Sequence, residues 1–121
     1  MDDQLSRSGD VSIQRHLDRA EVLRSTMEQL CKDLSLSCDD LNAPAEVDTA
    51  FEGLREQVLP VLQQLDSQGE HALKVAMYRV DIPEPHFRRT LASGGLHALA
   101  GQVVLRALQK VLTRLRYAGS F

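Results

Sequence analysis

Apolar residues recur every three or four positions over most of this chain, and no other feature of the sequence constrains the fold as strongly. That spacing places apolar side chains on one face of an α-helix, whereas a half-buried strand alternates at every second residue. It predicts helices over residues 13–34, 44–65, 68–81 and 96–117. No segment has the alternation of a strand, so the sequence predicts an all-α fold.

Proline and glycine residues divide the C-terminal half of the chain. A residue that precedes proline is disfavoured in the helical region, so Pro83 should end the third helix near Asp81. Residues 83–91 predict a short helix, and the Ser93–Gly94–Gly95 segment should separate it from the last one. The predicted architecture is a four-helix bundle with an additional short helix before the last helix.

Three local features add predictions about the helices. Pro60 lacks the main-chain N–H that would bond the carbonyl of Glu56, so the second helix should kink or break there. Ser67 and Glu70 have the spacing of a capping box at the start of the third helix. Gly101 lies inside the last helix, where glycine costs about 1 kcal/mol against alanine. A close crossing of two helices would explain that glycine.

The first predicted helix has one apolar and one charged face. The charged face carries Arg15, Asp18, Arg19, Lys32 and Asp33. The apolar face carries Ile13, Leu17, Ala20, Leu23, Met27, Leu30, Cys31 and Leu34. This apolar stripe runs over three heptads, which is long enough for a seam between two chains.

A chain of 121 residues has room for one domain. Residues 1–9 are interpreted as a disordered lead-in, and residues 10–121 as a single bundle domain. Aromatic residues make up only 4% of the chain, so the core must be built mainly from aliphatic side chains. No apolar run is long enough to span a bilayer, and the N-terminus has no apolar signal segment. We therefore expect a cytoplasmic protein that does not bind a membrane.

Charge is divided unevenly along the chain. Residues 1–70 hold 6 Lys or Arg against 15 Asp or Glu, a net charge of −9, whereas residues 71–121 hold 8 against 2, a net charge of +6. A basic half can bind an anionic partner, or the two halves can pack together and neutralise each other. The overall charge of −3 and the lack of interleaved aromatic residues argue against specific binding of nucleic acid.

Two charged rows share a spacing of four residues, which places each row on one face of a helix. The acidic row is Asp48, Glu52 and Glu56, and the basic row is Arg106, Lys110 and Arg114. We predict that the two rows face each other, within one chain or between two copies.

The sequence holds no motif that carries enzyme chemistry. Glu-x-x-His and His-Glu-x-x-His, which hold metal ions on helices, are absent, as are the glycine-rich phosphate loop and the nucleophile elbow. Cys31 and Cys38 have the spacing of neither a redox pair nor a zinc pair, and whether they form a disulfide stays open. We therefore expect no enzyme activity, no metal and no cofactor.

One short segment resembles a known family. His71-Ala72-Leu73-Lys74 is similar to the His-x-Leu-Lys core of histidine phosphotransfer domains, which are four-helix bundles of about this length. The resemblance implies that His71 accepts a phosphoryl group and that Lys74 is its charge partner. It covers four residues, and Val75 stands where that family usually has a glycine.

A second resemblance covers the C-terminal third of the chain. Residues 78–84, Tyr-Arg-Val-Asp-Ile-Pro-Glu, and residues 107–112, Ala-Leu-Gln-Lys-Val-Leu, resemble small uncharacterised helical proteins of bacteria, a group that implies no activity. Broad apolar faces without a catalytic set predict a non-enzymatic bundle that binds another protein and self-associates as a homodimer or larger oligomer. The alternative is a phosphotransfer relay through His71.

Overall fold

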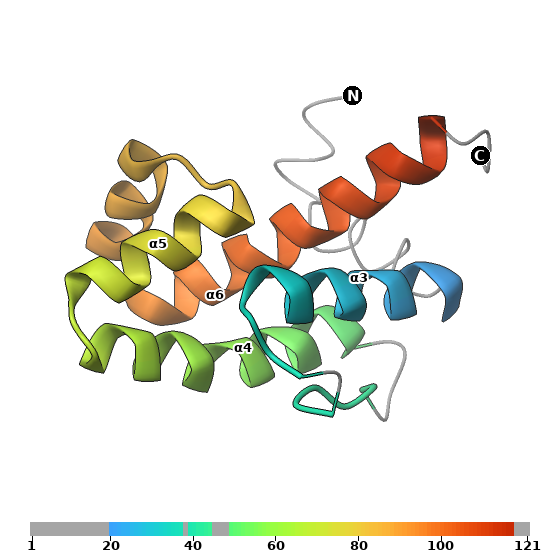
Figure 1. Ribbon diagram of the computed structural model, residues 1–121, viewed down its shortest axis with the longest axis horizontal. Helices are drawn as coiled ribbons and strands as arrows, with labels where there is room; N and C mark the ends of the chain where they lie inside the picture. Colours follow the sequence, from blue (N-terminus) through green and yellow to red (C-terminus); the bar gives the residue numbers. More distant parts are fainter. Residues whose placement is uncertain (1–19, 38, 45–48, 118–121) are drawn as a thin grey trace.

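The computed structural model describes residues 20–37, 39–44 and 49–117. These residues form helices and no strand, which confirms the all-α prediction (Figure 1). The helices are α3 (Ala20–Asp33), α4 (Ala50–Ser67), α5 (Glu70–Val80) and α6 (Glu84–Tyr117). The part of the first predicted helix that precedes Ala20 lies outside the described residues.

Helix α6 consists of two helical arms, 84–94 and 96–117, that meet at Gly95. The backbone of Gly95 has φ 69° and ψ −162°, a conformation that is open almost only to glycine. The predicted short helix and the break after it are therefore confirmed. The two arms point in different directions, and ion pairs hold the first arm beside the N-terminal half of α5 (Figure 1).

Helix α5 ends where the sequence predicts, and its C-terminus is a Schellman motif. Asp81 adopts the left-handed conformation with φ 74°, and its N–H donates to the carbonyl of Tyr78 at 3.1 Å. The N–H of Ile82 donates to the carbonyl of Met77 at 2.9 Å, and both of these side chains are buried. Two main-chain carbonyls at the end of α5 that have no partner within the helix thus accept hydrogen bonds before Pro83.

One local prediction is wrong, and of the kink or break predicted at Pro60 the break does not occur. The cap of α5 is Gly69, with φ 124°, and no side chain caps this helix, so the predicted capping box is wrong. Ser67 is the last residue of α4, and its hydroxyl donates to the carbonyl of Gln64 at 2.7 Å.

Helix α4 runs through Pro60 without a break, because Pro60 is exposed while Val58 and Leu62 on either side of it are fully buried. The packing of that apolar face holds the helix together despite the missing hydrogen bond.

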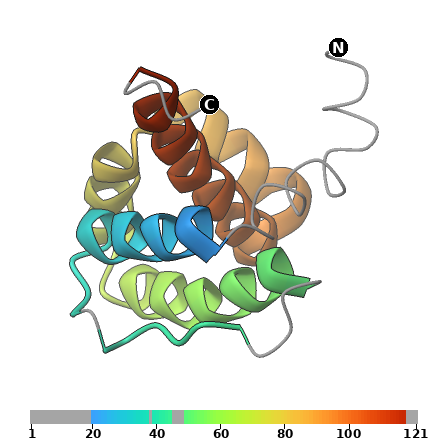
Figure 2. The same ribbon diagram turned by 90° about the vertical axis from the view of Figure 1, so that its right-hand side faces the viewer.

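Helix α6 is the central element, and α3, α4 and α5 all pack against it (Figure 2). Its second arm buries an aliphatic face at Leu99, Ala100, Val103, Val104, Ala107, Leu108 and Val111. A methyl group added to Gly101 would lie 3.2 Å from Cδ of Arg55 and 3.7 Å from Cζ of Phe51. The close crossing of α4 and α6 therefore accounts for this glycine, as the sequence predicts.

Among the described helices, none has the length and hydropathy needed to cross a bilayer.

Candidate functional site

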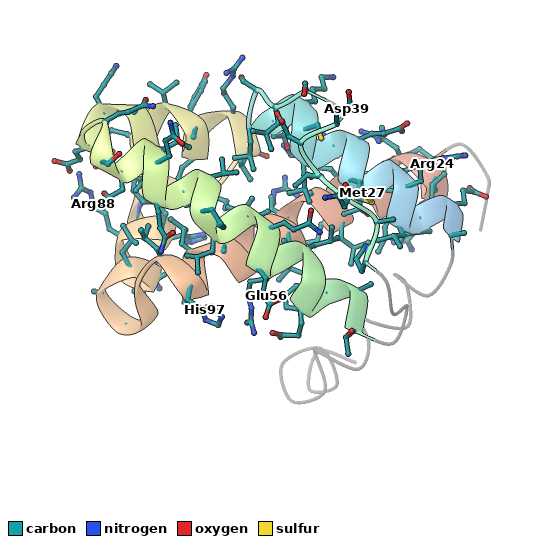
Figure 3. All side chains as sticks on the ribbon, turned by 90° about the horizontal axis from the view of Figure 1, so that it is seen from below. Arg24, Met27, Asp39, Glu56, Arg88 and His97 are labelled. Atoms are coloured by element: carbon teal, nitrogen blue, oxygen red, sulfur yellow. The ribbon has the colours of Figure 1, made fainter. Side chains whose placement is uncertain are left out.

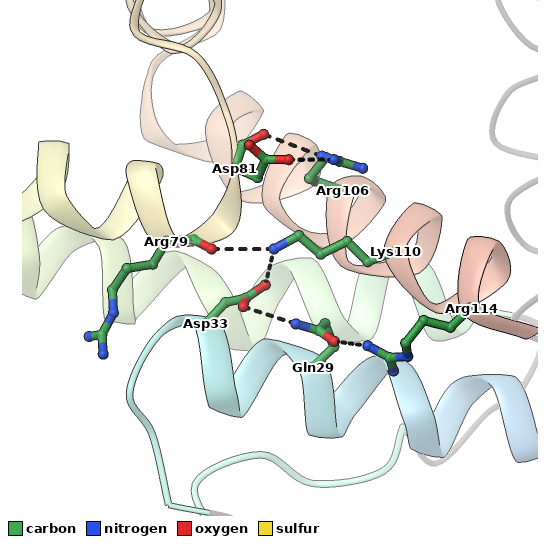
Figure 4. Close-up of polar contacts among 7 residues, drawn as sticks. All are labelled: Gln29, Asp33, Arg79, Asp81, Arg106, Lys110 and Arg114. Carbon is green, nitrogen blue, oxygen red and sulfur yellow. Dashed lines mark hydrogen bonds and ion pairs between the residues drawn. The ribbon is translucent and has the colours of Figure 1, made fainter.

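A network of charged and amide side chains joins α3, α5 and α6 (Figure 4). Its centre is the ion pair between Lys110 on α6 and Asp33 at the end of α3, with Nζ and Oδ2 2.8 Å apart. The side chains of Asp33 and Lys110 are only 7% and 19% exposed. The Nε2 atom of Gln29 donates to the other carboxylate oxygen of Asp33 at 2.9 Å, so both oxygens of this buried carboxylate are satisfied.

Side chains of the basic row contact α3 and the C-terminal end of α5. The C-terminal ends of these two helices lie close together beside α6 (Figure 1). Lys110 Nζ donates to the carbonyl of Arg79 in the last turn of α5 at 3.3 Å. Arg106 donates to the main-chain carbonyl of Asp81 at 3.2 Å and to its carboxylate at 2.6 Å. Arg114 donates to the side-chain oxygen of Gln29 on α3. Cations at these positions satisfy orphan carbonyls and interact favourably with the negative ends of the helix dipoles.

These contacts correct the sequence-based placement of Asp33. The helical spacing assigned it to the charged, outward face of the first helix, but it is buried between α3 and α6. The inward face of α3 is built around Val22, Thr26 and Leu30, all with no exposed surface. Asp33 continues that face because it lies three residues after Leu30.

Within the described residues, neither Glu52 nor Glu56 of the acidic row forms an ion pair with the basic row. Glu52 forms an ion pair with Arg55 on its own helix, and Glu56 is exposed on α4 (Figure 3). The basic row bonds Asp81, Asp33 and Gln29 instead. Asp48 lies outside the described residues. Pairing of the two rows between copies stays a prediction.

Ion pairs at the surface shift the protonation equilibria of two carboxylates. The hydrogen bond and positive charge of Arg106 lower the pKa of Asp81 below its ordinary value. Hydrogen bonds from Arg88 and Lys74 lower the pKa of Glu84, and the bond to Glu84 in turn raises the pKa of Arg88. These groups fasten the first arm of α6 to the start of α5, because Arg88 also bonds Glu70 at 2.8 Å.

The proposed phosphoacceptor His71 is exposed in the first turn of α5. Lys74, its implied charge partner, forms an ion pair with Glu84, with Nζ and Oε1 3.2 Å apart. Val75 and Tyr78 follow on α5, and their exposed fractions are 42% and 85%. Because these residues are spaced by four and three positions, His71, Val75 and Tyr78 share one solvent-facing side of the helix.

The outer side of α3 borders an apolar groove of about 470 Å³. The groove lies between α3 and the segment 39–44, and its apolar lining is Ala20, Leu23, Met27, Cys31, Leu41 and Ala43. Arg24 and Glu28 also line it, one helical turn apart (Figure 3). Four members of the apolar stripe seen in the sequence thus line the groove, and two of them, Leu23 and Cys31, also belong to the buried core. The sequence alone did not separate the groove side of α3 from its core side.

No three His, Cys, Asp or Glu side chains among the described residues lie together in a way that could hold a metal ion. Cys31 is buried, and its possible disulfide partner Cys38 lies outside the described residues.

Comparisons with the known protein families, with curated proteins and with solved structures give no match.

Proposed function

We propose that this protein is a non-enzymatic helical bundle that acts by binding another protein chain, a second copy of itself included, through the groove along α3. The observation that carries the proposal is the open apolar lining of that groove. Met27 is only partly buried, and Ala20 and Ala43 are exposed. Apolar surface that remains in contact with water favours association, because its burial releases about 25 cal/mol per Å².

The charges beside the groove favour a second copy as the occupant. Arg24 and Glu28 have opposite charges, are both exposed and lie four residues apart on α3. In a two-fold dimer with antiparallel α3 helices, Arg24 of one protomer would face the partner's Glu28, and the symmetry would repeat the pair. Met27 lies between the two charges in the sequence and would contribute apolar contact near the axis.

Sedimentation equilibrium of the full chain from about 1 to 100 μM tests self-association. We expect a dimer that Met27→Glu dissociates, because a carboxylate would then be buried at the seam. The matched control is Val75→Glu, which adds the same charge at a partly exposed apolar residue of α5 and should leave the dimer intact. A monomer at every concentration would refute self-association; residues 1–19 covering the groove of their own chain would give that result.

Charge reversal tests the two-fold geometry separately. Arg24→Glu alone and Glu28→Arg alone should each weaken the dimer, because like charges then face each other twice. Two exposed pairs of about 0.2–1 kcal/mol each correspond to roughly a 2- to 30-fold change in Kd. The double variant should restore the original affinity. If the double variant binds as weakly as the single ones, the antiparallel arrangement is wrong.

The exposed face of α5 favours a second candidate function, a phosphotransfer relay through His71. An accessible imidazole beside exposed Val75 and Tyr78 suits the docking of another domain. The test is incubation with several phosphorylated receiver domains and detection of acid-labile label. Label that disappears in His71→Gln but persists in His97→Gln, a control at another exposed histidine, supports the relay. No label from any receiver counts against it.

A further inference from the structure

A chain of shallow hollows runs along the side of α6 that faces away from α4. One hollow, of about 350 Å³, lies beside Arg89 and Ser93 in the first arm. The next, of about 410 Å³, shares His86 and Gln102 with it. A third, of about 320 Å³, lies between α3 and α6 and shares Arg106 with the second. Neighbouring hollows have lining residues in common and so lie next to each other, and the three together are named the groove.

This groove carries an excess of positive charge. The cations that line it are Lys32, Arg89, Arg106, Lys110 and Arg114, which together define the cationic groove. Asp81 and Asp33 compensate Arg106 and Lys110. In the part of the chain that the structure describes, the other three cations have no carboxylate within ion-pair distance. A ligand with several negative charges would form ion pairs with these three cations.

The spacing of the available cations in the basic row matches an extended peptide. Lys110 is held by Asp33 and by the carbonyl of Arg79, so the row members with free donors are Arg106 and Arg114. They lie eight residues apart on α6, which is about 12 Å along the helix axis. In an extended chain, side chains on the same side repeat every two residues, or about 6.6 Å, so residues four apart are separated by about 13 Å. Acidic side chains at alternate positions include such pairs and would therefore meet Arg106 and Arg114.

The lining also supplies hydrogen-bonding groups for a peptide backbone. Gln102, Gln109 and Thr113 line the groove between the charged positions. The Thr90 hydroxyl oxygen lies 2.9 Å from the carbonyl of His86 and 2.8 Å from the side-chain amide of Gln102, and in either arrangement that amide keeps an N–H able to donate to a ligand. Arg106 keeps guanidinium donors beyond the two used by Asp81, so it can bind a second carboxylate.

We propose that the cationic groove binds an extended acidic segment of a partner protein, with Asp or Glu at alternate positions. Nucleic acid is the less favoured polyanion, because no Phe, Tyr or Trp side chain lines the groove and His86 is the one aromatic ring among its lining residues. The groove and the apolar surface proposed for self-association use different residues of α3, so either proposal stands if the other fails.

Fluorescence anisotropy with labelled octapeptides tests the proposal. One peptide alternates Glu and Ser, and the other has four Glu followed by four Ser, so that both have the same composition and charge. We expect saturable binding of the alternating peptide, tighter than that of the block peptide and weakened by salt. The triple variant Lys32→Gln, Arg89→Gln and Arg114→Gln should bind about tenfold more weakly or worse. The control Arg116→Gln, an exposed cation of α6 outside the groove, should bind like the unaltered chain.

Several results would overturn the inference. These are no saturable binding up to about 1 mM peptide at low salt, equal affinity of the triple variant, or equal affinity for the two peptides. Tighter binding of single-stranded DNA than of the alternating peptide would also overturn it. The double variant Lys32→Gln and Arg89→Gln guards against misfolding, because no ion pair or hydrogen bond within the described residues holds either side chain. Its circular dichroism melt should match that of the unaltered chain, while its affinity for the alternating peptide falls.

Discussion

Removing Lys110 should destabilise the protein far more than removing an exposed cation. In Lys110→Met, the 7%-exposed carboxylate of Asp33 loses its 2.8 Å ion pair and keeps only the amide of Gln29. Loss of one partner of a buried ion pair typically costs about 3–5 kcal/mol. Because Lys110 is itself 19% exposed and water can partly replace it, we expect the lower end, about 3 kcal/mol. That is a large part of the 5–15 kcal/mol by which such domains are stable.

Urea denaturation followed by circular dichroism at 222 nm measures this loss. The matched control is Arg88→Met, which breaks the pairs with Glu84 and Glu70 at a side chain that is 51% exposed. Exposed pairs contribute about 0–1 kcal/mol, so this variant should remain close to the unaltered protein. The double variant Asp33→Asn and Lys110→Met should be more stable than Lys110→Met alone, because no charge is then buried without a partner.

Two outcomes would refute this reasoning. Equal free energies of unfolding for Lys110→Met and Arg88→Met would mean that burial adds nothing to the Asp33 pair. Strict additivity of the Asp33 and Lys110 substitutions would mean that the two side chains do not interact, since coupled neighbours deviate by about 0.5–3 kcal/mol.

Two further predictions concern pH and backbone strain. Arg106 lowers the pKa of Asp81 in the folded state, whereas in the unfolded chain the pKa of Asp81 is near 3.8. The pair therefore stabilises the protein at pH values above 3.8. This contribution is lost as the pH falls through the pKa of Asp81 in the folded state. Thermal melts from pH 6 to pH 2 should therefore show Asp81→Asn less stable than the unaltered chain at pH 6 and the difference shrinking at pH 2; a constant difference would contradict the linkage. Gly95→Ala should cost about 1–3 kcal/mol in urea denaturation, because an L-residue is strained at φ 69° while nothing lies within 4 Å of the added methyl. A loss of stability below about 0.5 kcal/mol would show that the two arms of α6 can be joined without a residue at positive φ.

The sequence indicates many of the residues that form the candidate site, but it does not show which of them contact each other. The basic row was recognised from its spacing, and its location on one face of α6 is confirmed. Its partners were not recognised, because Asp33 and Asp81 lie 77 and 25 positions before Lys110 and Arg106. One signal was available for Asp33: Gln29 precedes it by four residues on α3, and such a pair can form a hydrogen bond along a helix.

The sequence by itself determined the end of α5 before Pro83 and the junction at Gly95, although it did not determine the start of α5 or the continuity of α4 through Pro60. Gly95 and Pro83 act through the conformational preferences of their own backbone, and these preferences do not depend on the rest of the chain. The apolar spacing of α6 likewise determined its buried face, because a wide apolar arc has only one way to avoid water.

Only the tertiary structure decided how α3 is rotated and which charges it meets. Helical spacing predicts that the apolar stripe faces the core, but Val22 and Thr26, which lie outside that stripe, are also fully buried, and Met27 of the stripe faces a groove. The same rotation buries Asp33 against Lys110 and leaves Glu52 paired along its own helix. Several rotations of one helix bury similar apolar area, so the choice among them depends on the packing and hydrogen bonding of neighbouring helices, which the spacing of one segment does not contain.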